Sequence, residues 1–216
     1  MRVLSVNVGR PRTNPWKGLG MTGIDKRPVD GPVAVVEPGP KGTGVSGLVG
    51  DRVYDVKHHG GTDQAVYAYA REDLDRWEAE LGRPLGNGAF GENLTTAGLD
   101  VNAALIGERW RIGDQVILEV SCPRLPCGTF QGWLEREHWI KEFTAAALPG
   151  PYLRVIEPGE IRAGDPIEVV YRPDHDVTVA VTFRATTLEP GLLPLLSAAD
   201  ALPEELKHQA RRRVNS

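Results

Sequence analysis

The stretch QVILEVSCPRLPC, residues 115–127, places an apolar strand directly before a loop that two prolines restrict. Cys127 closes this stretch, and a thiol at the point where a strand ends can face a pocket. Free cysteine often behaves as a small buried hydrophobe, so an inert core residue is the alternative. Arg124 lies three residues earlier, and its charge would favour a thiolate if the two side chains converge. Cys127 is therefore the first candidate site residue.

Outward from this stretch, the chain alternates short apolar runs with turn residues. Its 216 residues include 25 glycines and 17 prolines, which separate brief runs of Val, Ile, Leu and Tyr. This pattern of short apolar runs separated by glycine and proline is typical of a β-barrel or a β-sandwich. We predict strands over residues 3–8, 33–36, 47–51, 65–70, 109–112, 115–120, 152–157 and 167–171.

Helical patterns interrupt the strands and then replace them. Residues 71–81 carry Leu74, Trp77 and Leu81 on one face and stop at Gly82, the usual C′ position. A second helix is predicted over residues 131–148. After a linker at 173–178, helical stretches are predicted at 179–185, 192–196 and 203–213, so we divide the chain into a domain of residues 1–171 and a small helical unit of residues 172–216.

Composition limits the classes of partner. Hydrophobic residues make up 41% of the chain, which suffices for one ordinary core. The formal charge of −4 argues against nucleic acid or an anionic membrane as a partner, since both favour a basic face. Two cysteines form no disulfide framework, the first residues, MRVLSVNVGRP, lack a signal-peptide pattern, and no apolar run approaches a membrane span. We therefore expect a cytoplasmic protein.

The segment VKHHGGTDQAVYAY, residues 56–69, carries the second chemical feature. Gly60–Gly61 can adopt backbone conformations that turn amide groups toward an anion or a bulky ligand. Adjacent residues of an extended chain point to opposite faces, so at most one of His58 and His59 serves a site. We favour His59 because it adjoins the glycines. Lys57 offers a phosphate partner, with a merely solvated lysine as the alternative.

The segment FGENL, residues 90–94, is the third feature. Gly91 permits a tight turn, and Glu92 and Asn93 offer an acceptor and an amide that can orient a ligand. Asn is also frequent in turns for backbone reasons alone. The segment therefore gains meaning only beside the other two.

Taken in order, several segments resemble the MOSC domain, named for the C-terminal domain of molybdenum cofactor sulfurase. The tail PDHDVTVAVTF, residues 173–183, resembles the three-helix unit that follows MOSC in the bacterial YiiM-like subfamily. The resemblance implies a β-rich α+β fold, a MOSC-type β-barrel with peripheral helices. The segments are GDRVYDVKHHGGTDQAVYAY (50–69), FGENLTTAGLD (90–100), IGERWRIGD (106–114), LEVSCPRLPCGTF (118–130) and GPYLRVIEPGEIRAGDPIEV (150–169).

The resemblance also implies a cofactor and its site. The Cys127 thiolate would ligate molybdenum held by the dithiolene of molybdopterin, and a soft thiolate suits such a sulfur-rich site. Asn93 would lie near the metal. GTFQ after Cys127 departs from the more basic or polar continuation that we expect, and Cys122 is an extra thiol, either a core residue or a disulfide partner of Cys127. The residues that match the pterin and phosphate pocket are Lys57, His59, Gly60, Gly61 and Arg124.

The implied activity is reduction of small N-hydroxylated compounds, such as hydroxylamine forms of purine bases, to amines. The cofactor would remove the oxygen while the protein ligates and orients, with His59, at an ordinary pKa near 6.5, as a hypothetical proton donor. The chain has no Rossmann fingerprint and no cysteine set for an iron–sulfur cluster. Electrons are therefore expected from a separate protein. Pyridoxal phosphate is associated with the family only loosely, and we do not expect it here.

Three other classes stay open. A thiol hydrolase would use Cys127, His59 and Asn93 as nucleophile, base and orienting residue. A zinc protein would use both cysteines and His58 with His59, although adjacent histidines suit a tetrahedral centre poorly. A non-catalytic carrier would bind the pterin or sulfur without turnover. The basic last helix is either a solvated end or a docking surface for an acidic electron donor or for a second copy in a homodimer.

Overall fold

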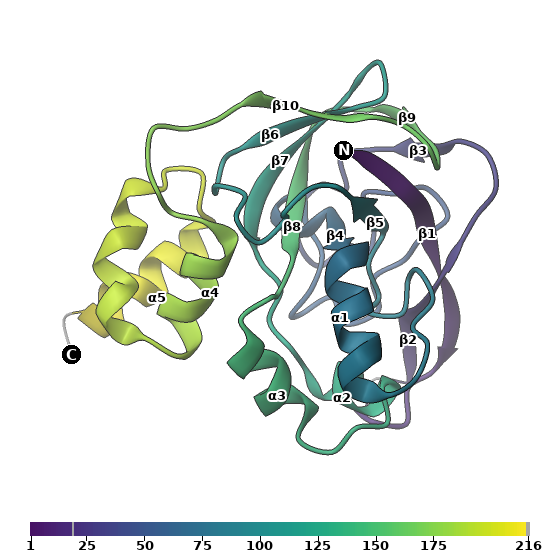
Figure 1. Cartoon of the computed structure of the whole chain (residues 1–216), viewed down its shortest axis with the longest axis horizontal. Coiled ribbons are helices and arrows are strands. Elements are labelled where there is room, and N and C mark those ends of the chain that lie inside the picture. Colours follow the sequence, from purple (N-terminus) through teal and green to yellow (C-terminus); the bar gives the residue numbers. More distant parts are fainter. Residues whose placement is uncertain (19, 215–216) are drawn as a thin grey trace.

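The computed structural model describes residues 1–18 and 20–214 and contains one large sheet with helices around it (Figure 1). Eight strands pair in the order β10-β6-β7-β8-β4-β5-β1-β2, and β3 (Val33–Val35) pairs separately with β9 (Gly159–Ile161). The eight strands are β1 (Arg2–Thr13), β2 (Met21–Pro28), β4 (Val66–Ala70), β5 (Leu94–Ala97), β6 (Arg109–Ile112), β7 (Val116–Pro123), β8 (Pro151–Glu157) and β10 (Ile167–Tyr171).

The expected closed barrel is not confirmed. The sheet ends at β10 on one side and at β2 on the other. It curls far enough that the Val3 N–H donates to the Asp165 carbonyl at 2.9 Å, and Arg2 and Pro166 form an isolated bridge. These contacts do not extend into a strand ladder. The chain is therefore a mixed α+β fold, rich in sheet, with helices at the periphery.

Most strand predictions are confirmed because apolar runs fill the core. Residues 109–112 and 167–171 are strands with the predicted bounds, and β7 is buried along nearly its whole length. The predicted strand at 47–51 is wrong, since Leu48 makes only an isolated bridge to Val35. The strands β2, β5 and β9 were not predicted, because they are either polar or very short.

Three short helices cover one end of the sheet. The helix α1 (Arg71–Leu81) has the predicted bounds, and Gly82 closes it at φ 64°. The single helix predicted over 131–148 is wrong: α2 (Gly128–Trp133) and α3 (Trp139–Ala146) are separate, since Glu135 and His138 both adopt positive φ. As a result, Cys127 lies directly before α2. The buried aromatic residues Trp77, Phe90, Phe130, Trp139 and Phe143 pack these helices together.

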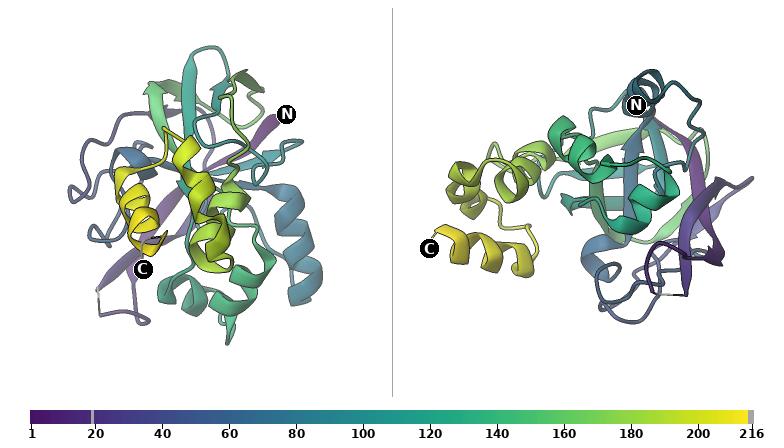
Figure 2. Two further views of the ribbon diagram at one scale, coloured as in Figure 1. Left: turned by 90° about the vertical axis from the view of Figure 1, so that its left-hand side faces the viewer. Right: turned by 90° about the horizontal axis from the view of Figure 1, so that it is seen from below.

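The C-terminal residues form a helical unit that packs beside the sheet (Figure 2). It contains α4 (Val179–Thr187), a 3-10 helix (Pro190–Ala198) and α5 (Glu204–Val214), so the three predicted helical stretches are confirmed. Val179, Leu193 and Leu196 belong to the same buried cluster as the sheet residues. The boundary at residue 171 stays a prediction.

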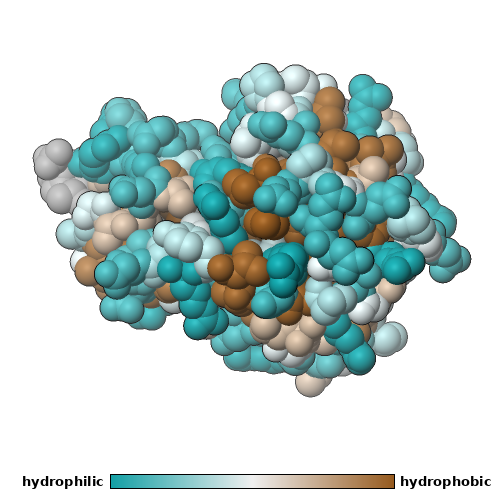
Figure 3. Space-filling view, turned by 90° about the horizontal axis from the view of Figure 1, so that it is seen from above, coloured by the Kyte–Doolittle hydropathy of each residue, from teal (hydrophilic) through white to brown (hydrophobic). Residues whose placement is uncertain are grey.

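The surface seen in Figure 3 is mostly hydrophilic, with apolar patches near the centre, toward the junction of the smaller lobe with the larger one. Among the described residues, no helix combines the length and apolar character that a membrane crossing requires.

Candidate functional site

Two adjoining hollows lie where the candidate segments meet. The inner chamber has a volume of about 130 Å³, and the outer cavity has a volume of about 390 Å³. They share His59, Gly60, Gln64 and Tyr152 as lining residues. The two hollows are therefore neighbouring parts of one site.

All seven residues selected from the sequence line one of these hollows. Asn93, Arg124 and Cys127 line the inner chamber, whereas Lys57 and Gly61 line the outer cavity. His59 and Gly60 face both. Segments far apart in the sequence thus converge as the motif order suggested, although the chemical roles of these residues remain predictions.

Cys127 is positioned by the end of β7 and the start of α2. Its carbonyl accepts a hydrogen bond from the Gln131 N–H at 3.0 Å, its side chain caps no backbone group, and the residue is partly exposed. Cys122 differs: it is buried on β7, and burial raises the pKa of its thiol to about 12. Both cysteines are free, so the alternative disulfide is not formed.

Arg124 is a buried cation held between aromatic rings. Its guanidinium carbon lies 3.8 Å from the centroid of the Phe130 ring and 4.9 Å from that of Tyr67, and Nη1 donates to the Phe90 carbonyl at 2.6 Å. Cation–π contacts and a charged hydrogen bond offset the loss of water around the guanidinium. The charge therefore has a fixed place in the inner chamber.

The electrostatic surroundings keep Arg124 charged. Burial disfavours its charge, but interactions with Tyr67, Tyr152 and Cys127 outweigh burial, so the pKa of Arg124 is raised. Arg124 and Cys127 both line the inner chamber, so the conditional convergence considered from their sequence spacing is met in position.

The two adjacent histidines have different environments. His58 is 57% exposed, and its Nδ1 lies 2.9 Å from Asp55 Oδ1. His59 faces both hollows, and its ring has no hydrogen-bond partner in the described part of the chain. Burial, then the charge of Arg124, lower the pKa of His59 to about 4, although Asp55 opposes this. The expectation of an ordinary pKa for His59 is therefore wrong, and its imidazole is neutral at pH 7.

Asn93 directs its amide into the protein. Its Nδ2 donates to Asp51 Oδ2 at 2.8 Å and to the Asn7 carbonyl at 3.3 Å, while its Oδ1 accepts from the Tyr67 N–H at 3.1 Å. Both amide hydrogens are thus committed. This geometry makes Asn93 a rigid part of the chamber wall rather than a partner for His59.

Asp51 is the site residue that the sequence analysis missed. Its carboxylate also accepts from Lys26 Nζ at 2.5 Å, from Ser46 Oγ at 2.9 Å and from the Gly9 N–H at 3.0 Å. Burial alone would raise the pKa of Asp51, but the charge of Lys26 and these hydrogen bonds lower it. Asp51 stands in the segment GDRVYDV, where a Gly-Asp pair signals only a turn.

The two glycines serve different purposes. Gly60, at φ 84°, donates its N–H to Gln64 Oε1 at 3.2 Å. Gly61, at φ 81°, lets another loop approach, because a Cβ there would lie 2.7 Å from the backbone nitrogen of Lys41. Of the two glycine N–H groups, that of Gly61 has no hydrogen-bond partner within residues 1–18 and 20–214. One amide of the predicted anion turn is therefore available to a ligand.

The described residues contain no group of three or more His, Cys, Asp or Glu side chains that could hold a metal ion. The zinc alternative therefore lacks its ligand set. The hydrolase alternative lacks the contact from Asn93 to His59 that would orient the base. Neither alternative gains support from the geometry.

Comparisons with known proteins identify the family of this chain. The family model described as the MOSC domain matches residues 55–168. The uncharacterized protein YflK of Bacillus subtilis is 36% identical over 178 residues, which cover 82% of this chain and 76% of that protein. Protein YiiM of Escherichia coli is 31% identical over 199 residues, covering 89% and 84%.

A third relative is longer. A protein named reductase from Gibberella moniliformis is 31% identical over 205 residues, which cover 93% of this chain. The match spans only 35% of that reductase. The match therefore does not assign the activity of the whole reductase to this chain.

Solved structures show the same architecture. The crystal structure of YiiM from Geobacillus stearothermophilus has a TM-score of 0.79 and 28% identity, with 99% of this chain and 98% of that one covered. The crystal structure of YiiM from Escherichia coli has a TM-score of 0.74 and 25% identity, covering 100% and 94%. The chain therefore belongs to the MOSC domain family and is YiiM-like in both sequence and fold.

Proposed function

We propose that this chain binds a molybdenum cofactor through Cys127 and reduces N-hydroxylated small molecules to amines. The observation that carries the proposal is the pairing in the inner chamber of a partly exposed thiol, Cys127, with a buried cation, Arg124. Membership of the MOSC family, whose members are associated with this cofactor, supports the same reading.

The donor set fits the proposed cofactor. A single thiol with no accompanying group of protein ligands among the described residues suits a metal whose other ligands come from outside the chain. The dithiolene of molybdopterin provides such sulfur ligands. When bound, the cofactor supplies the two-electron chemistry that removes an oxygen atom from nitrogen.

The residues around Cys127 would hold the cofactor in one position in the inner chamber. Arg124 stabilises negative charge on the thiolate and on the sulfur-rich group beside it. Asn93 cannot rotate freely, because Asp51, Asn7 and Tyr67 hold its amide. This rigidity gives the bound group one orientation.

The phosphate of the cofactor would lie toward the segment 57–61. Lys57 is exposed and has no ion-pair partner within the described ranges, so its ammonium group can meet an anion. The available N–H of Gly61 adds a neutral donor on the same side. His59 lies between this segment and the inner chamber.

His59 would act as a neutral imidazole and not as an imidazolium that is already protonated at pH 7. Since its pKa is about 4 without the cofactor, it can accept a proton or donate a hydrogen bond at pH 7. An anion placed beside it would raise its pKa, since opposite charge favours the charged form. Cofactor binding would then make His59 a better proton carrier.

The two electrons for each turnover would come from a separate donor protein. The chain has two cysteines, and both lie in the β7 region. An iron–sulfur cluster needs more thiolate ligands than this. The Gibberella relative is named a reductase, which supports reduction as the type of chemistry.

The proposed activity is tested by measuring the amine product directly. Protein made in molybdate-replete, cofactor-competent cells is mixed with a chemical one-electron reductant and 6-hydroxylaminopurine, and adenine is quantified by chromatography. We expect turnover by the wild type, and loss of at least 100-fold in rate for Cys127→Ser. Protein from molybdate-starved cells is the matched control and should be inactive. Molybdenum-loaded wild type that forms no amine would favour the carrier alternative and contradict the proposal.

A further inference from the structure

We propose that the α5 side of the outer cavity holds the organic part of the substrate and that α5 supplies its specificity-determining residues. This inference rests on the function proposed above and locates the substrate within that site. The C-terminal unit would then be part of the catalytic site and not an appended module.

The outer cavity has the size and the position for this role. Its volume of about 390 Å³ lies within the range of about 300–1,000 Å³ that is usual for small-molecule pockets. His59, Gly60 and Tyr152 line both hollows. A ligand in the outer cavity can therefore place one end beside the inner chamber that contains Cys127.

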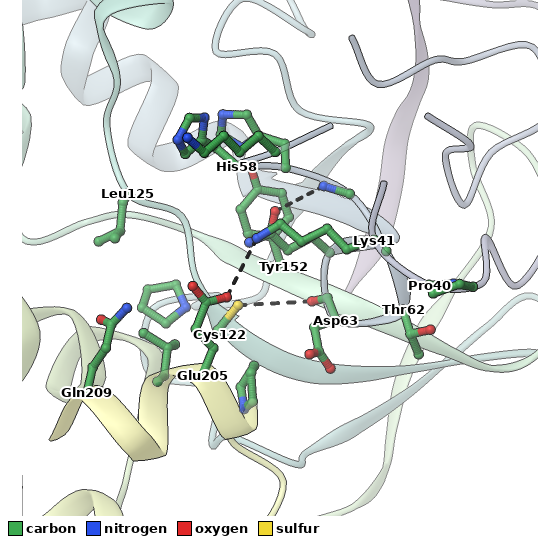
Figure 4. Close-up of a pocket in the computed structure, with 18 of the residues that line it drawn as sticks. Pro40, Lys41, His58, Thr62, Asp63, Cys122, Leu125, Tyr152, Glu205 and Gln209 are labelled. Atoms are coloured by element: carbon green, nitrogen blue, oxygen red, sulfur yellow. Dashed lines mark hydrogen bonds and ion pairs between the residues drawn. The ribbon is translucent and has the colours of Figure 1, made fainter. Parts of the chain in front are cut away.

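The cavity is built from two parts of the chain (Figure 4). Tyr152 and Cys122 belong to the sheet, whereas Glu205 and Gln209 rise from α5 on the opposite side. Lys41 reaches across between them. The helical unit thus completes a wall that the sheet leaves open.

Lys41 is held in place by the glycine turn. The backbone of Lys41 packs so closely on Gly61 that a Cβ would lie 2.7 Å from its nitrogen, and Thr62 Oγ1 donates to the Gly39 carbonyl at 3.2 Å. The Lys41 Nζ lies 3.6 Å from Glu205 Oε2. The two groups form an ion pair, but their separation exceeds a hydrogen-bond length of about 2.7–3.2 Å and their side chains are 37% and 70% exposed, which leaves hydrogen-bonding positions on each for a ligand.

The lining suits a flat heterocycle with donors and acceptors at its edge. Tyr152 offers an aromatic face, and Leu125 and Leu206 add apolar walls. Gln209 is exposed at the cavity, and its side-chain amide has no hydrogen-bond partner in the part of the chain that the structure describes. An amide can donate and accept at once, as recognition of a heterocycle edge requires.

The same wall is poorly suited to the phosphate of a cofactor. From α5, the outer cavity receives a carboxylate, an apolar side chain and an amide, from Glu205, Leu206 and Gln209. Lys207 of the same helix instead pairs with Glu204 at 2.8 Å. Lys41, the cation that reaches this wall, is paired with Glu205, so we assign the phosphate to the side of residues 57–61 and the α5 side to the substrate.

The test replaces a residue of α5 by a larger one that occupies part of the outer cavity. It then compares substrates of different size. Gln209→Trp would narrow the outer cavity, and His208→Trp is the matched control, since His208 is exposed on the same helix but lines neither hollow. For Gln209→Trp we expect the KM for 6-hydroxylaminopurine to rise at least tenfold. The KM for hydroxylamine and the molybdenum content should stay within twofold of wild type, and His208→Trp should change none of these.

A loss of molybdenum or pterin in Gln209→Trp would overturn the inference, because the α5 side of the outer cavity would then hold the cofactor. Equal changes for both substrates, or no change, would also overturn it. Calorimetric titration of adenine into cofactor-free protein gives a readout that needs no turnover. If wild type reduces no N-hydroxylated compound, the proposed function fails, whereas adenine binding that only Gln209→Trp weakens still supports the cavity assignment. Equal adenine binding by all three proteins contradicts it.

Discussion

The amide nitrogen of Asn93 lies 2.8 Å from Oδ2 of Asp51, so a hydrogen bond joins two segments that are 42 residues apart. The same carboxylate pairs with Lys26, whose side chain is 11% exposed, while that of Asp51 is 2% exposed. Asp51 therefore ties together Asn93 and Lys26, two residues in the wall of the inner chamber.

Replacement of Asp51 by Asn should destabilise the fold strongly. Loss of one partner from a buried ion pair costs about 3–5 kcal/mol, and Lys26 would keep its charge without an anion. Asp75→Asn is the matched control, because Asp75 is 61% exposed beside Arg71 and exposed pairs contribute about 1 kcal/mol or less. Urea unfolding at pH 7 measures both. Equal small effects would show that Asp51 does not hold the wall.

The lowered pKa of Asp51 also predicts acid sensitivity. Its folded-state pKa lies below the ordinary value of 3.8, so its stabilising contribution is present above pH 3.8 and is lost as the pH falls below that value. The free energy of unfolding of wild type should therefore decline more steeply below pH 4 than that of Asp51→Asn.

His59 predicts a pH dependence of stability in a different window. Its folded-state pKa of about 4 lies below the ordinary 6.5, so between these values the unfolded chain binds more protons and the stability of wild type falls as the pH falls. At pH 5 this effect is worth up to about 2 kcal/mol. His59→Gln should gain stability relative to wild type by that order between pH 7 and pH 5. A constant difference across this range would contradict a neutral, buried His59.

The close contact at Gly61 predicts a specific intolerance of side chains. Gly61→Ala adds a Cβ at positive φ and 2.7 Å from the backbone of Lys41. Gly82→Ala is the matched control, since Gly82 also has positive φ but nothing lies within 4 Å of its added Cβ. We expect the control to lose about 1 kcal/mol and Gly61→Ala at least about 2 kcal/mol more. Thermal and urea unfolding test this, and equal losses would refute the contact.

The two thiols should differ in reactivity. Cys122 is 3% exposed, and burial raises its pKa to about 12, whereas Cys127 is partly exposed in the inner chamber. Iodoacetamide at pH 8 should therefore add one label to cofactor-free protein, as read by intact mass. Cys127→Ser should remove that label and Cys122→Ser should keep it. The reverse pattern would place the accessible thiol on Cys122.

The sequence predicted what local patterns determine. The helix over 71–81 and its end at Gly82 follow from apolar spacing and from the left-handed conformation that glycine accepts. The strand at 21–28 was missed because MTGIDKRP is a polar edge with no apolar alternation. The helix break between 133 and 139 was missed because Glu135 and His138 carry no turn signal, although both adopt positive φ.

The candidate site, like the fold, could be predicted from the sequence only in part. Motif order brought Cys127, Arg124 and His59 to one place, and the hollows contain all three. Asp51 could not be found, since its role arises from contacts between distant segments. The lowered pKa of His59 likewise depends on burial beside Arg124, which the spacing of residues does not reveal.

Metal and pterin analysis tests the central claim most directly. Wild type, Cys127→Ser and Cys122→Ser are purified from the same molybdate-replete, cofactor-competent cells, and molybdenum is measured by mass spectrometry beside the oxidised pterin by fluorescence. We expect close to one molybdenum and one pterin per chain in wild type and in Cys122→Ser, and a loss of at least tenfold in molybdenum for Cys127→Ser. Folded wild type without molybdenum or pterin, or Cys127→Ser with full molybdenum, would contradict Cys127 as the anchor of the cofactor.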